Sequence, residues 1–204
     1  MKVLLLNGSP HEHGCTYTAL AEVEKTLRDC GMETEILWLG NGPVQDCVGC
    51  HSCHRTGKCV LQDDIVSVIL EKAAAADGFV FGSPVYYAHP SGRILSILDR
   101  VFFAGGSSFA HKPAASVISA RRGGTTASFD VLNKYFTISQ MPVVSSTYWN
   151  MVHGNKPEDV LQDAEGLQTM RNLARNMAWL MKSIEKAGLP LPETERGAFT
   201  NFIR

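Results

Sequence analysis

The chain has 204 residues, 45% of them hydrophobic, and a formal net charge of −1. This length and apolar content suit one domain with a sizeable core and exclude a disordered chain. The balanced charge argues against a nucleic-acid-binding protein, and no apolar run approaches the roughly 18 residues of a membrane-spanning helix. The first ten residues, MKVLLLNGSP, contain too short an apolar run for a signal peptide, so we expect a cytoplasmic protein.

Apolar runs and helical patterns alternate along the chain. A continuous apolar run at 3–6 predicts a strand that is buried on both faces. Further strands are predicted at 36–39, 79–81, 114–120 and 143–144. Helices are predicted from Thr16 to Gly31, over 65–76, 94–102 and 125–139, and from Pro157 to about Lys186.

This alternation predicts an α/β fold, in which a parallel sheet of five strands is covered by helices on both faces. We expect one domain over residues 1–187, a cysteine-rich loop over 46–62 inside it, and an extended C-terminal tail over 188–204. Ligands of such sheets bind at the carboxyl ends of the strands, where the strand order reverses. The loops after the first, third and fourth strands are therefore the candidate binding loops.

The loop after the first strand, NGSPHEHGCT (7–16), is rich in glycine and hydroxyl groups. The hydroxyls of Ser9 and Thr16 and the first backbone N–H groups of the helix that follows could bind a phosphate. The sequence matches neither the dinucleotide-binding pattern nor the P-loop pattern, and a phosphate monoester such as that of FMN fits better. The alternative is an ordinary strand–helix turn in which Thr16 caps the helix.

The loop after the third strand, SPVYYAHP (83–90), carries two adjacent aromatic residues. A flat conjugated ligand could stack on Tyr86 or Tyr87, although the two tyrosines could instead belong to a surface turn. Asp99 and Arg100 follow in the next helix, and we expect them to form an ion pair that holds this helix in place.

Four cysteines, Cys47, Cys50, Cys53 and Cys59, lie within thirteen residues in the spacing C-x2-C-x2-C-x5-C. Three interpretations are open: a [4Fe–4S] cluster held by the four thiolates, a structural zinc ion, or a reduced loop without metal. Zinc sites usually have two separated C-x2-C pairs, which makes zinc the weakest of the three.

Several segments together resemble the flavodoxin-like, NAD(P)H-dependent FMN reductase family, and especially its iron–sulfur flavoprotein branch. The similarity covers nearly the whole chain, and the combination of segments is more specific than each of them alone. The segments are NGSPHEHGCTYT (7–18), CVGCHSCHRTGKCVLQDD (47–64), GFVFGSPVYY (78–87), LDRVF (98–102), ARRGGTT (120–126) and DAEGLQTMRNLARNMAWLMK (163–182).

The resemblance implies a flavodoxin-like three-layer sandwich with a five-stranded parallel sheet of order 2-1-3-4-5 and FMN at the switch point. It implies that three groups of residues contact FMN: the phosphate group Ser9, His11, Gly14, Cys15 and Thr16; the ring group Pro84, Val85, Tyr86 and Tyr87; and the loop group Ser119, Arg121, Arg122, Gly123 and Gly124. The family usually has Arg or Lys at the position of His11, and Asn or Ser at that of Cys15.

The role of Arg121 and Arg122 has three possible interpretations. A guanidinium beside the flavin would stabilise its anionic reduced form. The two side chains could instead face solvent, or bind a phosphate of a nicotinamide cofactor.

We therefore expect an FMN-dependent oxidoreductase that takes electrons from NAD(P)H or a reduced partner. The electrons would pass to a quinone, another small molecule, a protein or an iron–sulfur centre. The resemblance also implies a homodimer or homotetramer, and the long last helix and the cysteine loop offer surface for such an interface. Two other functions remain open: a non-catalytic electron carrier like flavodoxin, and a redox sensor that forms disulfides in the cysteine loop.

Overall fold

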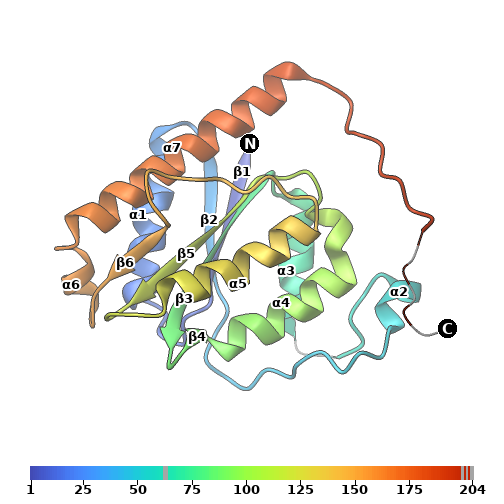
Figure 1. Cartoon of the computed structure of the whole chain (residues 1–204), viewed down its shortest axis with the longest axis horizontal. Helices are drawn as coiled ribbons and strands as arrows, with labels where there is room; N and C mark the ends of the chain where they lie inside the picture. The colour runs from blue at the N-terminus through green and yellow to red at the C-terminus, as the bar shows by residue number, and fades with distance from the viewer. Residues whose placement is uncertain (62–63, 199, 201, 203–204) are drawn as a thin grey trace.

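The structure is a computed structural model, and it describes residues 1–61, 64–198, 200 and 202 (Figure 1). Gln62, the last residue of the predicted cysteine loop, and residues 199, 201, 203 and 204 of the predicted tail lie outside the described residues. The strands are β1 (Lys2–Asn7), β2 (Glu33–Trp38), β3 (Gly78–Tyr86), β4 (His89–Pro90), β5 (Ala114–Ala120) and β6 (Met151–His153). The helices are α1 (Cys15–Asp29), α2 (Ser52–Thr56), α3 (Asp64–Ala75), α4 (Gly92–Gly105), the 3-10 turn η1 (Gly106–Ser108), α5 (Thr125–Ile138), α6 (Pro157–Val160) and α7 (Ala164–Ala187).

Five parallel strands form the sheet in the order β2-β1-β3-β5-β6, which confirms the predicted order 2-1-3-4-5. The short strand β4, which was not predicted, pairs antiparallel with the end of β3 as a small hairpin. The strand order reverses between β1 and β3, because the chain continues from β1 to one side and from β3 to the other. The expected switch point is therefore present.

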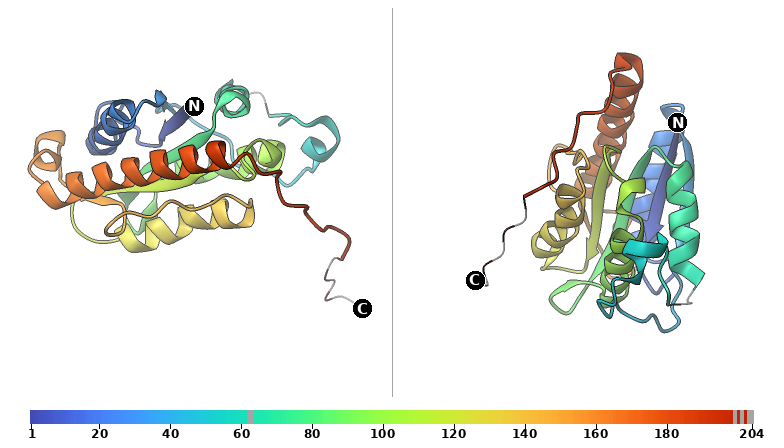
Figure 2. Two further views of the ribbon diagram at one scale, coloured as in Figure 1. Left: turned by 90° about the horizontal axis from the view of Figure 1, so that it is seen from above. Right: turned by 90° about the vertical axis from the view of Figure 1, so that its right-hand side faces the viewer.

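Helices cover both faces of the sheet. Along β1, Val3 and Leu5 face the core that α1 and α7 close, whereas Leu4 and Leu6 face the core under α3, α4 and α5. This double burial explains why the strand is an unbroken apolar run. The three layers can be followed in Figures 1 and 2, where α7 lies along one face of the sheet and α4 and α5 along the other.

Two predicted elements differ from the structure. The fifth strand is at Met151–His153, and Val143 makes only an isolated parallel bridge to Ala114. Ala114 of β5 pairs with Val143, and Ile118, four residues further along β5, pairs with Met151. The neighbouring segment thus uses eight residues where β5 uses four, so residues 145–150 leave the edge of the sheet as a loop. The predicted helix from Pro157 to Lys186 is two helices, because Asp163 interrupts it and caps α7 by accepting a hydrogen bond from Gly166 N.

The last helix ends at Gly188, which has a left-handed φ of 57°. The chain then continues as an exposed tail that leaves the body of the molecule (Figure 2). No helix among the described residues is both long enough and apolar enough to cross a membrane.

Candidate functional site

A cleft of about 210 Å³ lies at the carboxyl ends of β1, β3, β5 and β6. It is formed by the loops that follow these strands and by the first turn of α1. Its lining contains nine of the predicted cofactor-binding residues: Ser9, His11, Cys15, Thr16, Pro84, Val85, Tyr86, Ser119 and Arg121. Residues more than a hundred positions apart in the sequence thus meet at the switch point of the sheet.

Asn7, the last residue of β1, is fully buried and organises the first loop of the cleft. Its side-chain oxygen accepts a hydrogen bond from Ser9 N at 3.1 Å, and its amide nitrogen donates to Glu12 O at 2.9 Å. Ser9 Oγ in turn accepts from His11 N, and Ser9 O accepts from Trp38 Nε1. These four hydrogen bonds hold the backbone of the loop in its observed shape.

The first turn of α1 faces the cleft without a side-chain cap. Its N-cap is Gly14, and the first turn carries no acidic residue. The partial positive charge of a helix N-terminus is then available to an anion. The alternative in which Thr16 caps this helix is wrong, because Gly14 is the N-cap and Thr16 lies inside the helix. Thr16 is only 1% exposed, and its Oγ1 lies 2.8 Å from Ser119 Oγ.

Cys15 lies in the same turn, and its thiol donates to Gly154 O at 3.6 Å. Partial burial raises the pKa of this thiol, and the nearby Asp159 and Glu158 act in the same direction. The side chain is therefore neutral near pH 7, and adds no negative charge to a cleft that faces a helix N-terminus.

The β3–β4 hairpin closes the other side of the cleft. Tyr86 is partly exposed and lines the cleft, and burial raises the pKa of its hydroxyl. Tyr87 lies at the tip of the hairpin with a φ of 60° and is fully exposed. Gly124 has a φ of 91°, and a Cβ there would lie 2.8 Å from Val85 Cγ1, so the loop after β5 packs closely on the hairpin only because this residue is glycine.

Five predicted residues do not line this cleft. Gly14 lines a neighbouring depression, formed with Trp38 and Lys156. The other four are Tyr87, Arg122, Gly123 and Gly124. The structure thus separates the two arginines, since Arg121 faces the cleft and Arg122 does not.

Three lining residues were not predicted: Ala120, Gly154 and Asn155. Gly154 and Asn155 directly follow β6, and a glycine followed by polar residues is a usual sign of a loop after a strand. The sign was missed because the fifth strand was expected at 143–144.

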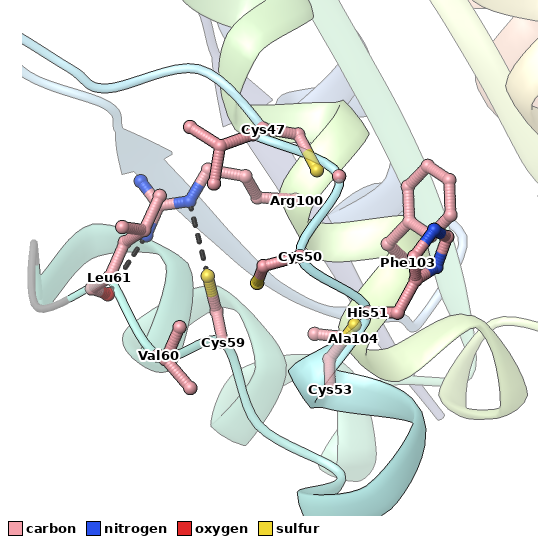
Figure 3. A pocket seen from close by; sticks show the side chains of 12 residues that line it. Cys47, Cys50, His51, Cys53, Cys59, Val60, Leu61, Arg100, Phe103 and Ala104 are labelled. Atoms are coloured by element: carbon pink, nitrogen blue, oxygen red, sulfur yellow. Dashed lines mark hydrogen bonds between the residues drawn. The ribbon is translucent and has the colours of Figure 1, made fainter.

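The four cysteines line a second, smaller pocket, together with residues of α4 (Figure 3). Gly49, between the first two cysteines, has a φ of 64°, and His51 has a φ of 54°, so the chain turns tightly here. In the described part of the chain, no three His, Cys, Asp or Glu side chains are arranged as ligands of one metal ion. All six cysteines are free thiols.

Arg100 forms one wall of the cysteine pocket (Figure 3). Its Nε donates to Cys59 Sγ at 3.3 Å, and its two terminal nitrogens donate to the backbone oxygens of Gln45 and Leu61.

The predicted ion pair between Asp99 and Arg100 is therefore wrong, because the two side chains have other partners. The hydroxyl of Tyr135 donates to Asp99, and burial together with this contact raises the pKa of Tyr135. Neighbours in sequence on a helix point in different directions.

The donor set of this pocket is four thiols. Four thiolates are the usual ligands of a [4Fe–4S] cluster and also of some structural zinc ions, so the residues present fit either group. His51 and His54 are exposed, and their rings lie against each other and against Phe103, on the outer side of α4.

Comparison with known proteins identifies the family. Residues 1–156 match the model of the family described as NADPH-dependent FMN reductase. An iron–sulfur flavoprotein of Methanocaldococcus jannaschii is 34% identical over 194 residues, which cover 91% of this chain and all of that protein. An iron–sulfur flavoprotein of Methanosarcina thermophila is 27% identical over 191 residues, covering 91% of this chain and 98% of the other.

Solved structures agree on the fold. The crystal structure of RosB with a bound 8-demethyl-8-formylriboflavin-5'-phosphate intermediate superposes with a TM-score of 0.73 at 14% identity, covering 100% of this chain and 94% of that one. A flavodoxin from the domain Archaea superposes with a TM-score of 0.60 at 12% identity, covering 89% of this chain and 99% of that one. The fold is therefore flavodoxin-like, and the chain belongs to the NADPH-dependent FMN reductase family, in the branch of the iron–sulfur flavoproteins.

Proposed function

We propose that this protein is an FMN-dependent oxidoreductase that takes electrons from NAD(P)H, or from a reduced partner, and passes them to an acceptor. The observation that carries the proposal is the cleft at the switch point, which combines the uncapped N-terminus of α1 with buried hydroxyls. When bound, FMN supplies the chemistry, because its ring accepts a hydride and can release electrons singly or in pairs.

The residues of the cleft bind and orient this cofactor. The backbone N–H groups of the first turn of α1 bind the phosphate, together with Ser9 and Thr16. Pro84, Val85 and Tyr86 cover the flat ring, and Arg121 provides positive charge at the loop after β5. The neutral thiol of Cys15 links the first turn of α1 to the loop at Gly154.

The cysteine pocket holds a [4Fe–4S] cluster in this proposal, with Cys47, Cys50, Cys53 and Cys59 as ligands. The four thiols around one pocket support it. Such a cluster would supply one-electron transfer, which suits a protein acceptor. A quinone or another small molecule would instead take two electrons directly in the cleft.

The protein is proposed to act as a homodimer or homotetramer. Large aromatic side chains are exposed near the edge of the sheet and on the last helix, Trp149 at 51% and Trp179 at 70%. Exposed aromatic residues are common where subunits meet.

The test is the absorption spectrum of the full chain purified without oxygen, followed by steady-state oxidation of NADH and NADPH. Flavin bands with an additional broad iron–sulfur absorbance, and turnover with NADH or NADPH, are the expected results. Flavin bands without turnover would favour an electron carrier like flavodoxin. A protein that stays colourless after addition of FMN would contradict the proposal.

A further inference from the structure

Arg100 is a buried cation in a helix face that is otherwise apolar. It lies in α4 between the core residues Leu98 and Val101, and only 1% of its surface is exposed. A guanidinium is seldom buried unless its donors are satisfied. Here the donors reach out of the core to the cysteine loop, as Figure 3 shows for Cys59 and Leu61.

The acceptors of Arg100 lie on both sides of the cysteine motif. Gln45, whose backbone oxygen accepts at 3.2 Å, precedes the first cysteine by two residues. Leu61, whose backbone oxygen accepts at 3.0 Å, follows the last cysteine by two residues. One rigid guanidinium thus joins the chain just before Cys47 to the chain just after Cys59.

The contact to sulfur adds an electrostatic effect to this geometric one. The Nε–H of Arg100 points at Cys59 Sγ, and hydrogen bonds to the sulfur ligands of an iron–sulfur cluster raise its reduction potential. A positive charge held close to the pocket, away from water, also favours the more negatively charged reduced state.

We propose that Arg100 is a positioning residue for the iron–sulfur group of the cysteine pocket. It holds the two ends of the loop at the spacing that the ligands need, and its bond to Cys59 raises the reduction potential of the group. The proposal rests on the proposed function, because it requires the cysteine pocket to bind an iron–sulfur cluster.

Lysine cannot replace arginine in this role. Arg100 donates to Cys59, Gln45 and Leu61 with three different nitrogens in a rigid plane, whereas an ammonium group is one compact point of charge on a flexible stem. Lysine therefore keeps the charge but not the spacing, which allows the two effects of Arg100 to be measured separately.

The experiment compares wild-type protein with R100Q, R100K and R93Q, all purified without oxygen and reconstituted with iron and sulfide. Arg93 is a matched control in the same helix, since its guanidinium also donates to loop backbone oxygens, but to those of Leu39 and Gly42, which precede the cysteine motif. Iron and FMN are measured per chain, loss of iron is followed with a chelator, and the reduction potential is measured by titration monitored by electron paramagnetic resonance.

We expect R100Q to bind FMN as the wild type does, but to hold iron about 10- to 100-fold more weakly, the usual effect of losing a group that orients metal ligands. Its potential should be more negative. R100K should lose iron as readily as R100Q while its potential stays nearer to that of the wild type. R93Q should match the wild type in both measurements.

Four results would overturn the proposal. The first is an R100Q variant that retains iron and has the reduction potential of the wild type, and the second is an R100K variant that retains all of its iron. The third is an R93Q variant that loses as much iron as R100Q, and the fourth is an R100Q variant that loses FMN in step with iron. Wild-type protein that binds FMN but no iron would remove the cluster and the role of Arg100 together, leaving the flavin site intact. Wild-type protein without FMN would instead contradict the proposed flavin site.

A measurement on the wild type covers the case in which the Arg100 variants do not fold. Protein labelled with ¹⁵N only in arginine is reduced and examined by pulsed electron paramagnetic resonance. A nitrogen coupling to the cluster is expected from the Arg100 Nε–H···S contact. A reduced cluster that shows no such coupling would refute the contact on which the proposal depends.

Discussion

Buried polar side chains define the shape of both candidate sites at the scale of single residues. Asn7 fixes the loop after β1, Thr16 joins α1 to β5 through Ser119, and Arg100 joins α4 to the cysteine loop. Each makes contacts that an apolar residue of similar size could not make. Their loss would leave a buried partner without a hydrogen bond, which costs more than the bond itself contributes.

Replacing Thr16 by valine tests the cost of removing such a buried hydrogen bond at the cleft. T16V keeps the shape of the side chain but leaves the Ser119 hydroxyl, 2% exposed, without its partner. We expect the free energy of unfolding to fall by about 1–2 kcal/mol and the affinity for FMN, measured by fluorescence quenching, to weaken. The matched control is T18V, because Thr18 Oγ1 bonds the backbone oxygen of Gly14 and is partly exposed. Equal effects of T16V and T18V would contradict the special role of Thr16.

At the scale of elements, one acidic cap positions both β6 and α7. Asp163 accepts hydrogen bonds from Gly166 N at the start of α7 and from His153 N at the end of β6. It also interrupts the long helical pattern at the point where the chain must turn. Helix α7 therefore begins beside the strand end that contributes Gly154 and Asn155 to the cleft.

Replacing Asp163 by alanine should reduce the free energy of unfolding by about 1–2 kcal/mol, the usual cost of losing a helix cap. Chemical denaturation of D163A and of the exposed control E165A measures the difference. Asparagine keeps an oxygen for Gly166 N, so D163N should recover part of the loss. A D163A variant as stable as E165A would show that neighbouring contacts alone hold α7.

Glu35 of β2 links three elements, because it accepts from Lys2 of β1 at 3.0 Å and from Lys72 of α3. The hydrogen bond from Lys72, and after it that from Lys2, lowers the pKa of Glu35, although partial burial acts in the opposite direction. The stabilisation that the Glu35 carboxylate gives to the folded state is therefore complete above the pKa that glutamate has in the unfolded chain, about 4.3. It is lost as the pH falls through the lower pKa of the folded state.

The variant E35Q should accordingly be less stable than the wild type by about 1 kcal/mol or less at pH 7, since the group is partly solvated. The difference should be constant above about pH 5 and shrink towards zero on acidification below the ordinary glutamate pKa. The control is E33Q, whose carboxylate is more exposed and lies 3.8 Å from Lys2. If the stability difference between E35Q and the wild type grew on acidification, the stabilising role of the ionised Glu35 carboxylate would be contradicted.

At the scale of the whole molecule, the C-terminal tail is separate from the packed layers. Residues 189–198 are exposed, and the side-chain hydrogen bonds described there join Thr194 to Gln140. The last core residue along the chain is Met181 of α7, which is 3% exposed and packs against Gly78 at the start of β3.

Deleting residues 189–204 should therefore leave the melting temperature and the affinity for FMN unchanged. Deleting residues 180–204 also removes Met181, and should lower the melting temperature by about 4 °C or more. Thermal unfolding of both truncated chains measures the difference. If the shorter deletion also lowered the melting temperature, the predicted boundary after residue 187 would be wrong.

The sequence by itself determined the alternation of strands and helices and the loops in which the binding residues lie, whereas the order of the sheet and most of the cleft residues were implied by the family resemblance. Strands buried on both faces leave a continuous apolar run, and the loops that follow them carry polar residues at fixed positions such as Ser9 and Thr16. These signals are local, so they can be read without knowledge of distant contacts. The four cysteines were found for the same reason, because their spacing is itself the signal.

Only the tertiary structure decided the contacts between distant segments. Val143 and Val144 form an apolar pair, but the edge position beside β5 is shared with Met151–His153, so the true end of the last strand was hidden. Arg100 stands beside Asp99 in sequence, yet helix geometry turns the two side chains towards different elements. Which partner satisfies a buried charge depends on how the elements pack, and that is decided by the fold as a whole.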